Sequence, residues 1–296
     1  MDLVCIKRKY KRVRRAIILS FFLTIFIYTF LVVSHVYAKK EKERIFQEDI
    51  VTISQVIKEQ EEQAKREEEK EEIKPKTLSA KEIEDLKNIY KLEGKQVFLT
   101  FDDGPSKTVT IPILDLLKQE NIKANFFVLG SRVELYPKIV KRAYEEGHYI
   151  ANHGYSHKYS QIYTSPASVL EEYNKTNQAV KDAIGKQLYN TNIFRFPGGS
   201  IGGIYNDLKQ EAKGLLEQNN IATVDWNALN GDSEGLRTEE ALLNRVKETI
   251  QGKNSVVILM HDAADKTKTY NTLPQIIDYL KQEGYEFKTF YDILGN

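Results

Sequence analysis

Two groups of polar residues in this sequence could together hold a metal ion. Asp102 and Asp103 follow the apolar residues 97–99 and precede a Gly-Pro pair that predicts a turn. Two neighbouring carboxylates repel each other in a dry site, so both stay ionised only where a cation or a base compensates them. His153 and His157 are four residues apart, which brings two imidazoles to one side of a helical turn or a tight loop. Two histidines and one aspartate provide three ligands and leave a position open for water, as in catalytic metal sites.

Three further polar groups follow apolar runs later in the chain. Arg195 precedes a Pro-Gly-Gly turn, Asp225 and Trp226 form a second group, and His261 ends a very apolar run. An arginine can hold a carboxylate through two hydrogen bonds, and glycines let backbone N–H groups approach a ligand closely. Each group alone also fits a structural role, such as a surface arginine, a core tryptophan or a buried histidine. Because all of them follow apolar segments, a shared site is the better interpretation.

The segments that must position these residues alternate between short apolar runs and amphipathic stretches. This alternation predicts an α/β domain with a parallel sheet, in which the chemistry lies at the carboxyl ends of the strands. Periodicity alone leaves open whether the strands close into a barrel or form an open doubly wound sheet. We expect strands at residues 97–101, 124–128, 149–151, 193–196, 222–224, 256–260 and 286–289, and helices at 112–119, 137–146, 165–184, 206–218, 238–251 and 273–283.

The polar groups, taken in this order, resemble the motifs of the NodB-homology polysaccharide deacetylases, also called carbohydrate esterase family four. The resemblance covers about residues 85–296. It implies a distorted (β/α) barrel of about seven strands for this segment. The residues that carry the resemblance are, in motif order, Thr100–Pro105, His153 with His157, Arg195–Gly199, Asp225 with Trp226, and Leu259–His261.

The resemblance also implies the central roles in the site. Asp103, His153 and His157 would bind a divalent metal ion, which we expect to be zinc. Asp102 would be the general base that activates the attacking water, and His261 would protonate the leaving amine. Amide hydrolysis requires both functions, because it needs a strong nucleophile near neutral pH and a proton for a poor leaving group.

Supporting residues would complete the site. By resemblance, Arg195 would orient the base, and Asp225 would tune the acid. The family usually has Ser or Thr after the first metal histidine, whereas this chain has Gly154, so we expect an altered metal affinity or loop rigidity. The backbone N–H of Gly198 would help to stabilise the oxyanion. The residues implied to contact the substrate are Pro197, Gly198, Trp226 and Leu259.

The N-terminus carries the pattern of a membrane signal. The basic segment 1–15 precedes an uncharged apolar run, residues 16–33, whose 18 residues can cross a hydrocarbon core of roughly 30 Å. The basic residues should remain in the cytoplasm, which places the rest of the chain outside the cell. We expect a transmembrane signal anchor at residues 16–36, in the cell membrane. The alternative is a cleaved signal peptide and a secreted domain, with Val36 and Ala38 before the cleavage site.

Residues 37–84 are expected to form a charged helical stalk. Residues 59–72 are almost entirely charged or polar, with acidic and basic residues four positions apart that support a solvated helix. They lack the apolar positions of a coiled coil, which favours a spacer. Residues 85–296 would then be the catalytic domain. The only cysteine, Cys5, excludes an intrachain disulfide.

The expected function is metal-dependent removal of N-acetyl groups from a cell-wall glycan. Peptidoglycan N-acetylglucosamine or N-acetylmuramic acid is the leading substrate, because the domain would face the wall. Chitin-like or poly-N-acetylglucosamine polymers remain an alternative, as does a non-catalytic glycan-binding domain on the same fold. No protein partner is expected. No nucleic-acid partner is expected either, because the basic cluster adjoins an apolar span, an arrangement that sets membrane topology.

Overall fold

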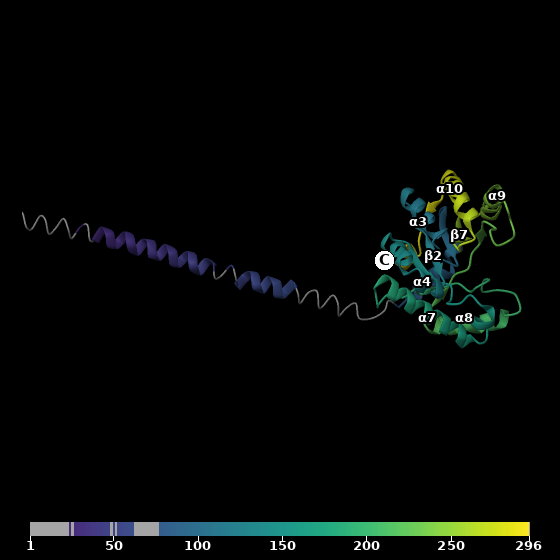
Figure 1. The fold of residues 1–296 in the computed structure, drawn as a ribbon, viewed down its shortest axis with the longest axis horizontal. Helices are drawn as coiled ribbons and strands as arrows, with labels where there is room; N and C mark the ends of the chain where they lie inside the picture. The colour runs from purple at the N-terminus through teal and green to yellow at the C-terminus, as the bar shows by residue number, and fades with distance from the viewer. Residues whose placement is uncertain (1–23, 25–26, 48–49, 51, 62–76, 296) are drawn as a thin grey trace, which may run out of the picture. The chain divides into compact units, whose positions relative to one another are not determined.

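The computed structural model divides the chain into two compact units, Met1–Ile73 and Lys74–Asn296 (Figure 1). The described residues of the first unit are helical. None of the described helices combines the length and the apolar character that crossing a membrane requires. The basic segment 1–15, residues 16–23, 25 and 26 of the apolar run, and residues 48, 49, 51 and 62–76 of the expected stalk lie outside the described residues. The structure describes residues 24, 27–47, 50, 52–61 and 77–295.

The second unit is built on a curled sheet in which every strand pair is parallel. The strand order is β5-β4-β3-β2-β1-β7-β6, and β8 pairs with β1. Among the described residues no pairing joins β5 to β6, so the curled sheet is an incomplete barrel. The strands are β1 (Gln96–Asp102), β2 (Asn125–Val128), β3 (Tyr149–Asn152), β4 (Ile193–Phe194), β5 (Ala222–Thr223), β6 (Ala228–Leu229), β7 (Ser255–His261) and β8 (Glu286–Phe287).

The central strand β1 is buried on both faces. Val97, Leu99 and Phe101 belong to one hydrophobic cluster, whereas Phe98 belongs to a second cluster and stacks on Phe290. This division follows from the side-chain alternation of a strand. Strands buried on both faces are typical of parallel sheets covered by helices.

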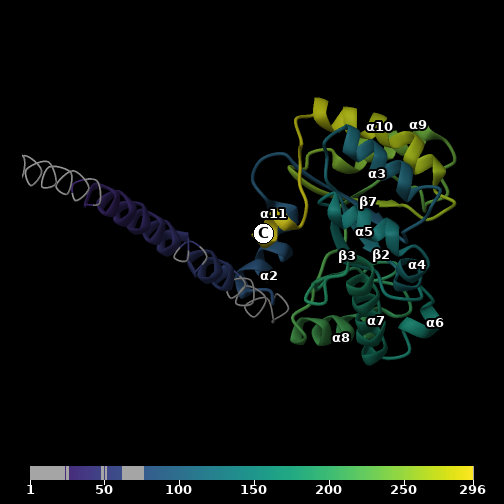
Figure 2. The ribbon, with the colours of Figure 1, turned by 60° about the vertical axis from the view of Figure 1, so that its left-hand side comes forward.

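Helices cover the sheet in two groups (Figures 1 and 2). In one group α10 packs against α3 and α9, and in the other α7 packs against α4, α5 and α8. The helices are α2 (Ala80–Lys87), α3 (Thr110–Gln119), α4 (Gly130–Leu135), α5 (Pro137–Glu145), α6 (Tyr159–Ile162), α7 (Pro166–Ile184), α8 (Asn206–Gln218), α9 (Glu239–Ile250), α10 (Thr267–Gln282) and α11 (Tyr291–Leu294), with the short 3₁₀ helix η1 (Ile89–Lys91).

Local sequence fixes the position of α7, the longest of these helices. Ser165 caps its start by accepting a hydrogen bond from the Ser168 N–H, and Pro166 occupies the first turn. Gly185 ends the helix with a φ of 74°, a conformation that glycine adopts without steric cost. These two ends set which residues of α7 face the site.

The predicted strands and helices are all present, with one clear error at α10. We expected this helix to begin at Leu273, but it begins at Thr267 and contains Pro274, although proline favours the first turn of a helix. Thr269, Thr272 and Leu273 are buried in the first turns, so tertiary packing outweighs the local preference. The short elements β6, η1, α4, α6 and α11 were not predicted from the sequence, and α2 begins within the segment that was expected to be the stalk.

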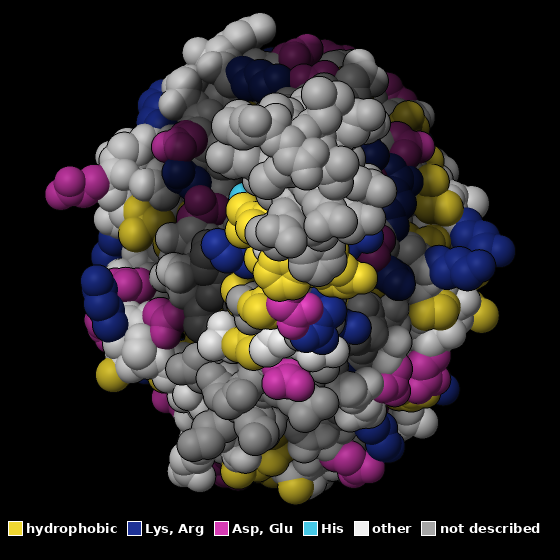
Figure 3. Space-filling model, turned by 90° about the vertical axis from the view of Figure 1, so that its left-hand side faces the viewer, with side chains coloured by type: hydrophobic (Ala, Val, Ile, Leu, Met, Phe, Trp, Pro, Cys, Tyr) yellow, Lys and Arg dark blue, Asp and Glu magenta, His cyan; other side chains and the backbone are white. Residues whose placement is uncertain are grey.

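The compact unit includes residues before position 85. Leu78, Leu86 and Ile89 are buried in the cluster that also contains Phe290. Leu78 and Asn220 exchange two hydrogen bonds, and α2 packs against α11 near the C-terminus (Figure 2). Acidic and basic side chains are interspersed over the face shown in Figure 3, in keeping with a formal net charge of +1.

Candidate functional site

The predicted site residues lie at the carboxyl ends of neighbouring strands. Asp102 ends β1 and His261 ends β7, and the two residues are paired in register. Asn152 ends β3 directly before His153, and Arg195 follows β4. Because the strands are parallel, these ends share one edge of the sheet, which brings the polar groups together.

Asp103, His153 and His157 form a cluster that could hold a metal ion. Each offers one ligand atom, and these atoms lie within 4.8 Å of one another. Asp103 Oδ1 is 3.6 Å from His153 Nε2 and 3.4 Å from His157 Nε2. This oxygen is buried and has no hydrogen-bond partner among the described residues, which is costly unless a cation satisfies it. Two histidines and a carboxylate therefore fit a divalent metal ion such as zinc.

The backbone turns Asp103 and His157 toward this cluster. Asp103 has a φ of 74° and His157 a φ of 55°, in a region that non-glycine residues seldom adopt. In a regular strand Asp102 and Asp103 would point to opposite faces. The left-handed turn at Asp103 removes this alternation and brings both carboxylates to one site.

His153 is held in the form that can bind a metal ion. Its Nδ1 lies 2.8 Å from the backbone oxygen of Arg195, which leaves Nε2 directed at Asp103. Burial lowers the pKa of His153 to about 3, so the imidazole is neutral. A hydrogen bond at the second ring nitrogen fixes the tautomer and orientation of histidine ligands.

Glu172 on α7 holds the loop between the two histidines. Its Oε2 accepts hydrogen bonds from the N–H groups of Tyr155 and Ser156, both at 2.7 Å. Its Oε1 accepts a third from the Ser156 hydroxyl, also at 2.7 Å. Hydrogen bonds to an ionised carboxylate are stronger than neutral ones. Glu172 was not predicted as a site residue, because in the sequence it cannot be told apart from a solvent-exposed glutamate of an amphipathic helix.

Gly154 has a conformational reason to be glycine. Its φ is 82°, and a Cβ at this position would lie 3.3 Å from Glu172 Oε2 and 3.1 Å from Ile162 Cδ1. Glu172 therefore holds the loop through Tyr155 and Ser156, the two residues that follow Gly154. The expected change in metal affinity stays a prediction.

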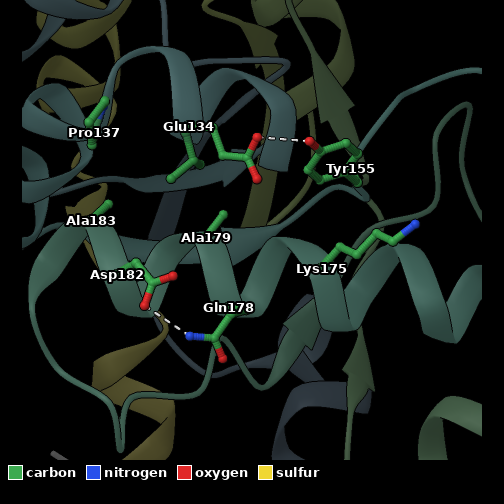
Figure 4. Close-up of a pocket in the computed structure, with 9 residues that line it drawn as sticks. Glu134, Pro137, Tyr155, Lys175, Gln178, Ala179, Asp182 and Ala183 are labelled. Carbon is green, nitrogen blue, oxygen red and sulfur yellow. Dashed lines mark hydrogen bonds between the residues drawn. The ribbon is translucent and has the colours of Figure 1, made fainter.

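Tyr155 lines a separate hollow of about 670 Å³ between α4 and α7 (Figure 4). Its hydroxyl donates a 2.8 Å hydrogen bond to Glu134 Oε2. Gln178 and Asp182 of α7 are joined by a second hydrogen bond along the wall of the hollow. None of the three candidate metal ligands lines this hollow, so it is distinct from the metal cluster.

Arg195 lies fully buried at the centre of the site. Its guanidinium donates hydrogen bonds to Thr100 Oγ1, to the backbone oxygens of Val224 and Asp225, and to the carboxylate of Asp102. It also lies 3.8 Å above the Phe127 ring. Burying an arginine is tolerable only where its donors are satisfied in this way.

Asp102 is the carboxylate that Arg195 holds. Its Oδ1 accepts a 2.8 Å hydrogen bond from Arg195 Nη1, and its Oδ2 lies 3.7 Å from His153 Nε2. Burial raises the pKa of Asp102, while the charge of Arg195 opposes this rise. A carboxylate with a raised pKa accepts protons more readily near neutral pH.

The partner of His261 is Asp232, not Asp225. Asp232 Oδ1 lies 2.7 Å from His261 Nδ1, and Oδ2 accepts the His261 N–H at 2.9 Å and the Thr269 hydroxyl at 2.6 Å. Burial opposes a charge on His261, but the hydrogen bond and the negative charge of Asp232 prevail and raise its pKa to about 9. The predicted link between Asp225 and His261 is therefore wrong.

Asp225 instead fixes the loop that follows β4. Its carboxylate accepts hydrogen bonds from the Ser200 N–H, at 3.1 Å, and from the Ser200 hydroxyl. After Asp225 the chain forms the short strand β6 and turns again before Asp232. Both aspartates follow short apolar segments, so the sequence alone did not distinguish the second from the first.

The comparisons with known proteins agree with this geometry. A model of the polysaccharide deacetylase family matches residues 90–216. The putative polysaccharide deacetylase YheN of Bacillus subtilis (strain 168) is 33% identical over 216 residues, which cover 72% of this chain and 73% of YheN. The chain belongs to the polysaccharide deacetylase family. As a member of this family it is a hydrolase of N-acetyl amide bonds, and the resemblance in the sequence is confirmed.

Two further relatives match a similar share of this chain. Peptidoglycan-N-acetylglucosamine deacetylase PgdA of Listeria monocytogenes serotype 1/2a (strain 10403S) is 35% identical over 205 residues. The match covers 68% of this chain but only 39% of PgdA, so the chain spans well under half of that relative. The structure of a Streptococcus mutans CE4 esterase has 33% identity and a TM-score of 0.63, covering 72% of this chain and 92% of that one. The curled α/β architecture is thus that of the esterase family.

The turn after Arg195 presents a free backbone donor in the deacetylase. Gly198 is exposed, has a φ of 75°, and its N–H donates to no other residue that the structure describes. A Cβ on Gly198 would lie 2.4 Å from the Tyr159 hydroxyl, so Tyr159 packs directly against this turn. The Tyr163 hydroxyl donates to the Pro197 oxygen at 2.6 Å and also holds the turn.

Trp226 and Leu259 are the remaining expected contacts of the substrate. Trp226 is half-buried, with its ring edge 3.1 Å from the position of a Cβ on Gly199. Leu259 is 6% exposed and lies in β7 two residues before His261. Both residues therefore flank parts of the site, at the Gly199 turn and at the end of β7.

Asp262 is a buried carboxyl that sequence reasoning missed. Thr110 donates a 2.6 Å hydrogen bond to it, and a Cβ on Gly104 would lie 2.1 Å from its Oδ2. Burial raises the pKa of Asp262 to about 7. The close approach explains why glycine follows the two site aspartates.

Proposed function

We propose that this deacetylase removes acetyl groups from peptidoglycan amino sugars, N-acetylglucosamine or N-acetylmuramic acid, and releases acetate. The observation that carries the proposal is the pairing of Asp102 with His261 at the ends of adjacent strands, beside the cluster of candidate metal ligands. A proton acceptor and a proton donor thereby share one edge of the sheet. The name of the Listeria relative supports peptidoglycan as the substrate.

In the proposed reaction Asp102, oriented by Arg195, takes a proton from the attacking water. The new C–O bond forms as the acyl oxygen gains charge, and the N–H of Gly198 donates a hydrogen bond to that oxygen. When bound by Asp103, His153 and His157, a divalent ion, which we propose to be zinc, supplies Lewis acidity that lowers the pKa of water to about 7.

His261 completes the reaction as the general acid. Its Nδ1 is occupied by Asp232, so Nε2 is the nitrogen that can deliver a proton. Burial lowers the pKa of this imidazole, but the hydrogen bond and the negative charge of Asp232 outweigh burial and favour the protonated form at neutral pH. Proton transfer to the sugar nitrogen allows the C–N bond to break, which leaves acetate and a free amine.

Acetate release from purified peptidoglycan fragments tests the proposal. Asp102→Asn should lower kcat by at least about 100-fold, the scale of general base catalysis, without changing the melting temperature. Asp278→Asn, an exposed site on α10, is the matched control and should retain full activity. A chelator should abolish activity, and added zinc should restore it. Full activity after chelation, or in Asp102→Asn, would contradict the mechanism.

We further propose that residues 16–36 anchor the deacetylase in the cell membrane with residues 85–296 outside. The basic segment 1–15 beside an uncharged apolar run supports this topology. Fractionation of cells that produce the full chain should recover it in the membrane, resistant to alkaline extraction. A shortened chain in the culture medium would instead indicate cleavage and secretion.

A further inference from the structure

A hollow of about 440 Å³ opens beside the candidate metal cluster. Two of the three candidate ligands, Asp103 and His157, line it. The hollow therefore provides space directly beside the candidate metal cluster. The other polar residues of its wall are Ser131, Arg132 and Ser156.

Arg132 is positioned by direct hydrogen bonds between α4 and the loop between His153 and His157, called the metal loop below. The N–H of Gly130 donates to the Gly154 oxygen at 3.0 Å, and the N–H of Ser131 donates to the Tyr155 oxygen at 3.1 Å. These residues directly precede Arg132, so the backbone of Arg132 is fixed relative to His157. Its side chain is exposed at the wall of the hollow.

The charge of Arg132 has no carboxylate partner among the residues that the structure describes. Arg142, Arg195 and Arg245 each form an ion pair with an aspartate or a glutamate. Glu134, on the same helix as Arg132, is directed instead to the hollow of Figure 4, where it accepts a hydrogen bond from Tyr155. An available guanidinium thus lies beside a catalytic site.

We propose that Arg132 recognises a carboxylate that the glycan carries next to the N-acetyl group being hydrolysed. A guanidinium presents a planar pair of N–H groups that matches a carboxylate, which an ammonium or a hydroxyl does not. The inference rests on the proposed deacetylase function and names its substrate class. The preferred glycan bears carboxylates, on lactyl ethers or on short peptides, and is not a neutral polymer of N-acetylglucosamine.

The test compares two soluble substrates of equal length with the full chain. One is a glycan fragment with free lactyl carboxylates, and the other is a neutral N-acetylglucosamine oligomer. Arg132→Gln should lower kcat/KM for the carboxylate-bearing fragment by about tenfold and leave the neutral oligomer unchanged. Added salt should reduce the difference between wild type and variant, because it screens an exposed charge. Arg132→Lys should retain part of the preference.

Lys138→Gln is the matched control, since it removes one exposed positive charge from the neighbouring helix α5. It should leave both substrates unaffected. An equal loss on both substrates, or no loss on either, would overturn the role of Arg132 while the deacetylase function stands. If wild type releases acetate from neither substrate, the proposed function fails. The Kd of the carboxylate-bearing fragment, measured by calorimetry for wild type and Arg132→Gln, then decides the inference independently of catalysis.

Discussion

His261 and Asp232 make protonation and folding interdependent. The pKa of His261 is raised from 6.5 to about 9, because Asp232 stabilises the charged imidazole more than burial opposes it. The folded state thus binds this proton more tightly than the unfolded state. The resulting stability is complete below about pH 6.5 and is lost as the pH rises through about 9.

We predict a loss of roughly 3 kcal/mol in the free energy of unfolding of the metal-free protein across this range, from this pair alone. In Asp232→Asn most of this pH dependence should disappear, because the partner charge is gone. Urea unfolding at pH 6.5 and pH 9 measures the difference for both proteins. Parallel pH profiles for wild type and variant would show that Asp232 does not set the pKa of His261.

The contact between Gly198 and Tyr159 predicts a second effect. Gly198→Ala should lower kcat at least tenfold, because the new Cβ collides with the Tyr159 hydroxyl and displaces the backbone donor. Adding Tyr159→Phe removes the colliding oxygen and should restore part of the rate. Acetate release by both variants measures the effect.

Gly202→Ala is the control for Gly198→Ala. Gly202 has a similar φ of 82°, yet no atom lies within 4 Å of its Cβ position, so the variant carries the backbone strain without the collision. If Gly202→Ala lost as much activity as Gly198→Ala, backbone strain and not the collision with Tyr159 would be the cause of the effect.

At the scale of elements, α7 supports the metal loop through Glu172. We predict that Glu172→Gln weakens metal binding about 10- to 100-fold, as is typical when a group that orients a ligand is lost. The charged acceptor of three hydrogen bonds disappears while the helix remains. Calorimetric titration of the metal-free protein with zinc measures the change.

Glu171→Gln is the matched control, because Glu171 is the preceding residue of the same helix and, among the described residues, forms an ion pair only with Lys175 on the surface. Its metal affinity should equal that of wild type. Similar affinities for the Glu172 and Glu171 variants would mean that α7 does not determine the conformation of the loop.

The sequence predicts those parts of the site that follow long apolar strands. Asp102 and His261 end strands of seven residues, so their position at one sheet edge follows from the pattern alone. Asp232 follows β6, a strand of two residues that leaves no periodic signal. The burial of Glu172 depends on how a loop folds over α7, and hydrophobic periodicity carries no information on such tertiary contacts.

At the scale of the whole molecule, the catalytic unit should fold without the first 73 residues. A chain that begins at Lys74 is expected to retain the melting temperature and acetate release of the full chain, because it keeps the complete compact unit. A chain that begins at Gly94 loses the buried side chains of Leu78, Leu86 and Ile89. Each is worth about 1.5–3 kcal/mol, so the sum approaches the total stability of a domain.

Thermal unfolding of the two truncated chains measures this difference. The shorter chain should unfold at a markedly lower temperature or fail to fold. Equal melting temperatures would show that α2 and η1 are dispensable. A destabilised chain from Lys74 would show that residues of the first unit contribute to the stability of the second.

Arg195 has a further consequence for how the parts of the site are held together. Its backbone oxygen accepts from His153, while its side chain holds Asp102. The candidate metal ligand His153 and the proton acceptor Asp102 are thus both held by one fully buried residue. Both groups therefore depend on the position of the same residue. The spacing between His153 and Asp102 is therefore set at Arg195, whereas the position of His157 depends on the loop that Glu172 holds.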